Sequence, residues 1–243
     1  MTPTTFSEIW VYLSASPLLG LTVTLLVYVL AYRLHELSGH NPLANPVAIS
    51  IAILGTLLWV SDTPYSTYFD GAQFVHFLLG PATVALAVPL YEQLGRLRRL
   101  WLPLLAGLVT GTLVATVSAV LLAHALGASR ATLASLAPKS VTTPVAMGIA
   151  EKLGGLPSLT AVLVVSTGVI GAATARFLFD AMRIGNPVVR GFALGTAAHG
   201  IGTARAFQVS EEMGAFAGLA MGLTALFSAV ALPPVVGQLL RWL

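Results

Sequence analysis

The chain has 243 residues, of which 56% are hydrophobic and only 9% are charged, with a formal net charge of +3. A soluble domain carries roughly 25% charged residues, so this composition excludes an ordinary soluble domain and predicts an integral membrane protein. The absence of cysteine excludes disulfides, thiolate nucleophiles and cysteine metal ligands. In a membrane protein, Lys and Arg report orientation, so the charge gives no reason to expect a nucleic-acid partner.

Long uncharged runs follow one another along the chain, each reaching the about 20 residues that a helix needs to cross a bilayer. They are Ile9–Tyr32, Leu37–Ser61, Gly71–Tyr91, Leu100–Ser129, Leu153–Ala175 and Met213–Leu240. Shorter apolar runs at 140–150 and 191–208 flank charged residues. These runs leave no room for a separate soluble domain. We therefore expect an all-α polytopic membrane protein, with residues 1–243 as a single membrane domain.

Basic residues set the expected orientation. The first sixteen residues contain no Lys or Arg, so the first run is expected to be a retained helix rather than a secretory signal. Arg33 follows that run, an acidic loop follows the second, and Arg96, Arg98 and Arg99 follow the third. Because cytoplasmic loops are rich in Lys and Arg, the amino terminus is expected outside the plasma (inner) membrane. A broken or re-entrant segment at 132–150 would leave about seven spans and a cytoplasmic Arg241.

The segment Pro138–Pro144 places a lysine, three hydroxyls and two prolines among apolar residues. A lysine deep in the membrane costs roughly 2.5 to 3.5 kcal/mol on insertion scales, so it normally faces protein, water or a ligand. Proline interrupts a helix, and non-helical backbone at membrane depth persists only where it is buried in protein or lines a cavity. We predict that residues 136–150 do not form one continuous helix, that Pro138 and Pro144 mark the breaks, and that a solute binds here.

An internal similarity relates Thr83–Gly95 to Thr142–Gly154, with a weaker third copy at Thr203–Gly214. In each copy a broken apolar segment ends at a Glu and a Gly, and a long apolar helix follows. Such repeats are typical of secondary transporters, whose discontinuous helices meet near the midplane. The candidate repeat units are 71–129, 130–189 and 190–243, in an inverted arrangement. Chance similarity between apolar segments is the alternative.

Three blocks, Leu79–Tyr91, Pro138–Pro144 and His199–Ala206, resemble the signature blocks of the LrgB/CidB family, over about Asn45 to Gln238. That family includes bacterial proteins described as antiholin-like or as regulators of murein hydrolase export. It also includes the carboxyl-terminal part of the plant plastidal glycolate/glycerate translocator. The resemblance implies transport of small carboxylates of the glycolate, glycerate, pyruvate or lactate type. It also implies a smaller LrgA/CidA-type membrane partner.

A carboxylate needs a positive charge or helix amino termini, together with hydroxyls or amides for a further oxygen. The candidate substrate-binding residues are Lys139, Ser140, Thr142 and Thr143 in one block and His199, Gly200, Gly202, Thr203 and Arg205 in the other. The expected helix breaks at the site are Pro81, Pro138 and Pro144. We expect Lys139 and Arg205 to converge on one cavity. In the alternative, Lys139 extends to the interface and Arg205 pairs with Glu211 or Glu151.

Proton coupling has two candidates. His199 belongs to the residue type that changes charge near neutral pH, and Glu151 follows the Pro138–Pro144 segment. A hydrogen-bonded packing role for His199, and charge balance between Glu151 and Lys152, are the structural alternatives.

Enzymatic function is not expected, because the sequence lacks metalloprotease, nucleophile-elbow and phosphate-loop motifs, and no cofactor or metal is expected. The stronger competitor is a holin-like pore or a regulator of cell-wall lysis, which needs oligomerisation but no binding pocket. Small residues at Gly107 and Gly111, and at Gly214, Gly218 and Gly222, favour close packing between helices or subunits. A homo-oligomer is therefore expected.

Overall fold

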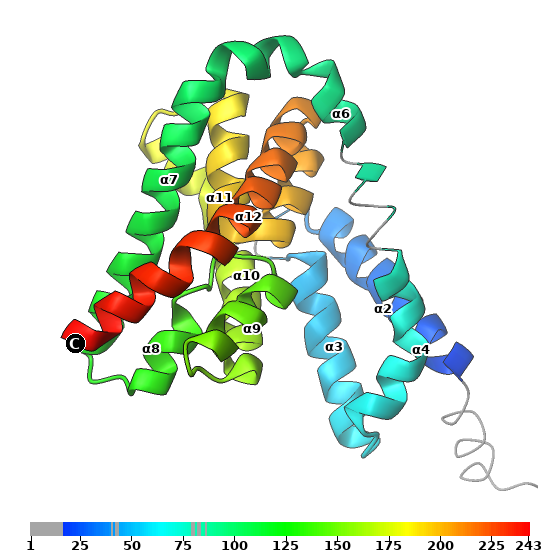
Figure 1. The fold of residues 1–243 in the computed structure, drawn as a ribbon. Coiled ribbons are helices and arrows are strands. Elements are labelled where there is room, and N and C mark those ends of the chain that lie inside the picture. The colour runs from blue at the N-terminus through cyan, green and yellow to red at the C-terminus, as the bar shows by residue number, and fades with distance from the viewer. Residues whose placement is uncertain (1–16, 40, 42–43, 79–80, 82–83, 86) are drawn as a thin grey trace, which may run out of the picture. The chain divides into compact units, whose positions relative to one another are not determined.

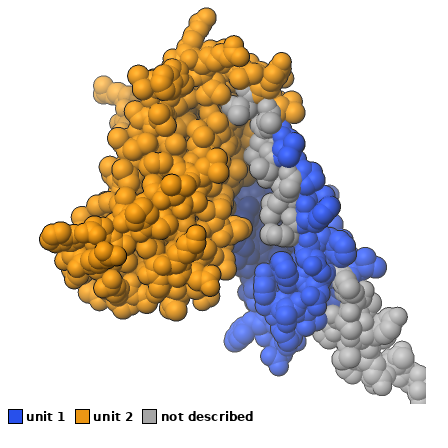
Figure 2. All heavy atoms as spheres, viewed as in Figure 1, with its two compact units in different colours: residues 1–85 blue, residues 86–243 orange. Residues whose placement is uncertain are grey.

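A computed structural model describes residues 17–39, 41, 44–78, 81, 84–85 and 87–243. All the regular secondary structure in these residues is helical, which confirms the prediction of an all-α polytopic membrane protein. The chain divides into two compact units, residues 1–85 and 86–243 (Figure 2). The boundary between them falls inside the candidate repeat unit 71–129.

Unit 1 contains α2 (Pro17–Leu37), α3 (Pro46–Val60) and α4 (Tyr65–Phe77), and α2 packs against both of the others. Asn45 caps α3, since its side-chain oxygen accepts hydrogen bonds from two backbone amides of the first turn, and Pro46 begins the helix. The hydroxyls of Thr24 and Tyr68 lie 2.7 Å apart and join α2 to α4.

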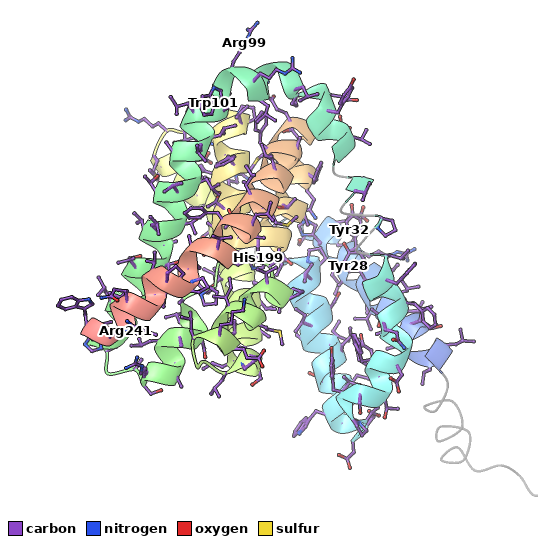
Figure 3. The ribbon with its side chains drawn as sticks, viewed as in Figure 1. Tyr28, Tyr32, Arg99, Trp101, His199 and Arg241 are labelled. Atoms are coloured by element: carbon purple, nitrogen blue, oxygen red, sulfur yellow. The ribbon has the colours of Figure 1, made fainter. Side chains whose placement is uncertain are left out.

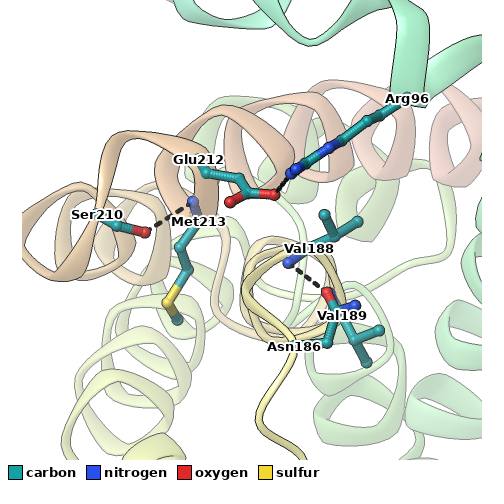
Figure 4. Close-up of polar contacts among 7 residues, drawn as sticks. All are labelled: Arg96, Asn186, Val188, Val189, Ser210, Glu212 and Met213. Atoms are coloured by element: carbon teal, nitrogen blue, oxygen red, sulfur yellow. Dashed lines mark hydrogen bonds and ion pairs between the residues drawn. The ribbon is translucent and has the colours of Figure 1, made fainter.

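Unit 2 contains α6 (Ala87–Glu92), α7 (Leu94–Ala125), α8 (Arg130–Leu136), α9 (Thr143–Lys152), α10 (Pro157–Ala181), α11 (Pro187–Val209) and α12 (Glu211–Trp242) (Figure 1). The helices α7 and α12 run in the same direction. Arg96 at the start of α7 pairs with Glu212 at the start of α12 (Figure 4). Near the other ends of these helices, Val120 and Leu232 share one buried cluster.

Four described helices are long and apolar enough to cross a membrane: α2, α7, α10 and α12. The helix α3 is apolar but has only 15 residues. The sequence predicted about seven spans. Part of the difference lies in the segment 191–208, which enters and leaves unit 2 at the same end. The segment 132–150 does the same, as the sequence predicts.

The segment between α7 and α10 is broken as predicted. The helix α8 has 7 residues and ends at Leu136, residues 137–142 form turns, and α9 has 10 residues. Neither helix reaches the length of about 20 residues needed to cross a bilayer. Pro138 lies in the turn and is fully buried, whereas Pro144 lies in the first turn of α9, where its missing N–H costs little. We call α8, the 137–142 turn and α9 the first hairpin.

The chain also reverses inside α11. Ala198 and His199 have non-helical backbone angles, and His199 adopts φ 41° and ψ −133°. A methyl group added at Gly202 would lie 2.7 Å from the carbonyl oxygen of Leu194, although the Cα atoms of these two residues would be about 12 Å apart along a straight helix. The arms 187–197 and 200–209 therefore lie against each other. We call α11 the second hairpin and residues 198–199 its tip.

The two hairpins enter unit 2 from opposite ends. The first connects the end of α7 to the start of α10, beside the cluster that contains Val120 and Val164. The second connects the end of α10 to the start of α12, where Phe179 and Met213 share another cluster. This second end carries Arg96, Arg99, Arg176 and Arg190, and we call it the arginine-rich end.

Arg99 and Arg241 lie at opposite ends of unit 2 (Figure 3). The sequence interpretation had placed both on the cytoplasmic side, which would require α11 to cross the membrane. The reversal at His199 removes that crossing and explains the difference.

The three copies of the internal similarity each contain a short helix followed by a long one. These pairs are α6 and α7, α9 and α10, and the second arm of α11 and α12. Thr83 lies outside the described residues, as do 79–80, 82 and 86 in and around the first signature block. The inverted relation between the units 71–129, 130–189 and 190–243 stays a prediction.

Candidate functional site

The tip of the first hairpin presents a cation and hydroxyls. Lys139 is half-buried, and its Nζ donates a hydrogen bond to Ser140 Oγ at 3.3 Å. Among the residues that the structure describes, no carboxylate lies within salt-bridge distance of Lys139. Thr142 precedes α9 as its N-cap without a side-chain capping bond, and Thr143 begins the helix. The tip therefore combines an ammonium, hydroxyls and a helix amino terminus, all of which attract anions.

Neighbouring helices fix the backbone of this tip. Thr116 on α7 donates from its hydroxyl to the Ala137 carbonyl at 3.2 Å. Thr160 on α10 donates to the Ser135 carbonyl at 3.1 Å, and the Leu156 amide donates to Ser135 Oγ at 2.7 Å. These bonds satisfy polar groups that the broken helix would otherwise leave unpaired in an apolar interior.

The tip of the second hairpin is centred on His199, which is only 5% exposed (Figure 3). Its Nε2–H donates to the Val164 carbonyl at 2.9 Å, since a carbonyl can only accept. Thr203 donates from its hydroxyl to the His199 carbonyl at 2.8 Å. The positive φ of His199 is a strained conformation for a residue other than glycine, and such strain concentrates at functional sites.

Both tips pack on the same part of α10. Val164 accepts the hydrogen bond from His199 and also belongs to the buried cluster that contains Ala137 and Val141 of the first tip. The structure thus brings the Lys139 block and the His199 block to one level of unit 2.

A layer of hydroxyls lies at this level on α7 and α12. On α7, Thr112 and Thr116 separate a buried leucine pair from Val120, and on α12, Thr224 and Ser228 separate Ala220 from Leu232. The residues before and after these hydroxyls belong to two different buried clusters. Within the described residues, the buried side-chain oxygens of Thr112, Thr224 and Ser228 have no hydrogen-bond partner. Unpaired buried hydroxyls are uncommon and favour a polar ligand or water at this level.

The sequence profile of the LrgB-like family matches residues 24–237. This chain belongs to the LrgB-like family. It is 34% identical to YwbG of Bacillus subtilis, an uncharacterized protein, over 216 residues that cover 89% of this chain and 96% of YwbG. It is 30% identical over 225 residues to proteins named antiholin-like protein LrgB from Bacillus mycoides and Bacillus cereus, covering 91% of this chain and 98% of each relative. No solved structure matches.

In this LrgB-family protein, Arg205 lies apart from the Lys139 block. It lines a cavity of about 210 Å³ together with Arg176 and Arg190, and no residue of the 137–142 turn lines that cavity. Its Nη1 donates to Gln208 Oε1 at 3.0 Å, and the described ion pairs do not join it to Glu211 or Glu151. The reversal at His199 is the reason, because it carries Arg205 back toward the arginine-rich end.

The remaining predicted residues have other surroundings. Gly202 packs against the first arm of α11, and Gly200 lies where a methyl group would be 3.8 Å from Met221 Sδ. Glu151 is exposed in the last turn of α9, about 12 Å along the helix from the tip. Pro81 is exposed, but its neighbours on both sides lie outside the described residues.

Sequence reasoning missed Thr112, Thr116, Thr224 and Ser228. Their spacing of four residues on two apolar helices indicates that they lie on the helix faces that pack into the core. It also did not single out Arg176 and Arg190 as binding residues.

Proposed function

We propose that this LrgB-family protein is a secondary transporter of small monocarboxylates of the glycolate, glycerate, pyruvate or lactate type, moved together with a proton. The observation that carries the proposal is the pair of broken helical hairpins that enter from opposite ends and pack on one level of α10. Discontinuous helices that meet inside the membrane are typical of secondary transporters.

The residues at the tips have suitable chemistry. Lys139, Ser140 and the amino terminus of α9 would receive the carboxylate, as an ammonium and a helix start both favour anions. The unpaired hydroxyls of Thr112 and Thr224 would receive a second oxygen, such as the hydroxyl or keto group of the substrate. His199 is the candidate for the coupled proton, because histidine changes charge near neutral pH.

A second candidate function rests on the names of the relatives. Proteins called antiholin-like protein LrgB cover almost the whole chain, and their names support a holin- or antiholin-like pore, or a regulator of murein hydrolase export and autolysis, more directly than they support carboxylate transport. A pore would give a flux that grows with the gradient, whereas a carrier saturates.

We further propose that the arginine-rich end faces the cytoplasm of the plasma (inner) membrane, since cytoplasmic loops are rich in Lys and Arg. With this orientation, α12 would carry Arg241 to the outside. An amino terminus outside remains part of the proposal, on the evidence of the basic residues in the sequence. We also propose that the protein assembles as a homo-oligomer or with an LrgA/CidA-type membrane partner.

Uptake into proteoliposomes of the purified protein tests this function. Labelled glycolate, glycerate, pyruvate and lactate are compared with and without a pH gradient, and each is competed with an unlabelled acid. The proposal predicts saturable uptake of at least one acid, increased by an inward proton gradient. Linear flux without competition would favour the pore. Absence of flux, in a protein that restores normal lysis to cells lacking it, would favour the regulator.

A further inference from the structure

The cavity around Arg205 lies between α10 and both arms of the second hairpin, near the arginine-rich end. Arg176 and Phe179 come from α10, Arg190 from the first arm and Arg205 from the second. Its volume is about 210 Å³. A water molecule occupies about 30 Å³ of liquid, so this space matches a phosphate group or a small organic acid.

Within the described part of the chain, the positive charges that line the cavity outnumber the carboxylates paired with them. Asp180 is the carboxylate paired with these arginines: its Oδ1 accepts from Arg190 Nη2 at 2.5 Å and its Oδ2 lies 3.8 Å from Arg176 Nε. Arg205 contacts the neutral side chain of Gln208 instead. Three guanidinium groups against one carboxylate leave an excess of two positive charges.

The three arginines differ in how firmly they are held. Arg190 also donates through Nε to the Ile184 carbonyl at 2.5 Å, and its guanidinium lies 5.6 Å from the centre of the Phe179 ring. Arg190 is therefore fixed by the protein. Arg176 has only a long contact with Asp180, and Arg205 has only an amide partner, so both retain donors for a ligand.

We propose that this cavity is a second anion site, which binds a carboxylate or phosphate group through Arg176 and Arg205. Planar guanidinium groups bind such oxygen pairs by two parallel hydrogen bonds. Because Arg176 belongs to α10 and Arg205 to the second arm of α11, the bound anion joins the second hairpin to α10. The site goes beyond the transport proposal, since its geometry is separate from the tips and its test requires no flux.

The test measures thermal unfolding of the full-length protein, followed by tryptophan fluorescence in nanodiscs of neutral phosphatidylcholine. Inorganic phosphate and lactate are titrated against chloride at matched ionic strength. A separate arm uses nanodiscs that contain phosphatidylglycerol without added anion, which separates a free anion from a lipid headgroup. The variants are Arg205→Gln and Arg176→Gln. The matched control is Arg98→Gln, which removes an exposed charge on the first turns of α7 outside the cavity.

We expect the soluble anions or the anionic lipid to raise the unfolding temperature saturably in the unmodified protein and in the Arg98→Gln variant. The apparent affinity should fall about tenfold or more in the Arg205→Gln and Arg176→Gln variants, the effect of losing a charge-assisted hydrogen bond. Stabilisation by the anionic lipid alone would assign the site to a headgroup phosphate. An equal rise in all variants, or no rise with any anion or lipid, would overturn the proposal. A failure of uptake with intact anion binding would contradict only the transport proposal.

Discussion

The strained backbone at His199 gives a prediction in which glycine and alanine have opposite effects from those in an ordinary helix. In a helix interior, glycine is less stable than alanine by roughly 0.5 to 1 kcal/mol. At residue 199 the φ of 41° is easily adopted by glycine and strained for alanine. We therefore expect His199→Gly to be more stable than His199→Ala.

The magnitude follows from two terms. Both variants lose the hydrogen bond to the Val164 carbonyl, and this term lowers the stability of each by about 1 kcal/mol or more. Strain at a sparsely populated backbone conformation is worth about 1 to 3 kcal/mol, and only glycine relieves it. After the entropic cost of glycine is subtracted, the mid-range values leave the glycine variant more stable than the alanine variant by about 1 kcal/mol.

Thermal unfolding in a fixed detergent measures this difference. For a chain of 150 to 250 residues, 1 kcal/mol moves the midpoint by about 2 to 4 °C, so the expected gap is roughly 2 to 4 °C. Ala197→Gly provides the control, because Ala197 is exposed on the first arm with helical geometry and glycine should lower the midpoint there. An alanine variant as stable as, or more stable than, the glycine variant would show that the chain does not reverse at residue 199.

Three further predictions concern the tips. Lys139→Ala should weaken carboxylate binding about tenfold to hundredfold, measured as a rise in KM for uptake, with insertion unchanged; an unaltered KM would remove Lys139 from the site. Thr112→Val removes an unpaired buried hydroxyl, so stability should stay equal or rise while KM rises, and a loss of stability with normal uptake would assign Thr112 to packing. Thr116→Val should destabilise the protein by about 1 to 3 kcal/mol, because the Ala137 carbonyl loses its donor; an unchanged unfolding midpoint would mean that this bond does not hold the tip.

The break in the first hairpin could be predicted from sequence because its cause is local. Proline is costly in a helix interior, so Pro138 and Pro144 favour a break, and Lys139 is costly at membrane depth. The reversal in α11 has a tertiary cause. Its apolar run is nearly long enough to span, and the chain turns where His199 bonds to Val164 and Gly202 packs on Leu194.

The unpaired hydroxyls were hidden from sequence for a related reason. A threonine in an apolar helix usually donates to the carbonyl four residues earlier, as Thr110 and Thr167 do. Only the packed structure distinguishes these from Thr112 and Thr224, which lack such a bond. The position of Arg205 likewise follows from the reversal in α11, which carries this residue away from the cavity that it was expected to share with Lys139.

The most direct test of the transport proposal is the concentration dependence of carboxylate flux into proteoliposomes. The unmodified protein and the Lys139→Ala variant are compared at equal protein content, across a range of substrate concentrations and a fixed pH gradient. A binding site formed by the tips of the two hairpins predicts a flux that reaches a plateau and is inhibited by a competing acid. The half-saturating concentration should be increased at least about tenfold in the Lys139→Ala variant. A flux that rises linearly with concentration and is identical in both proteins would contradict it.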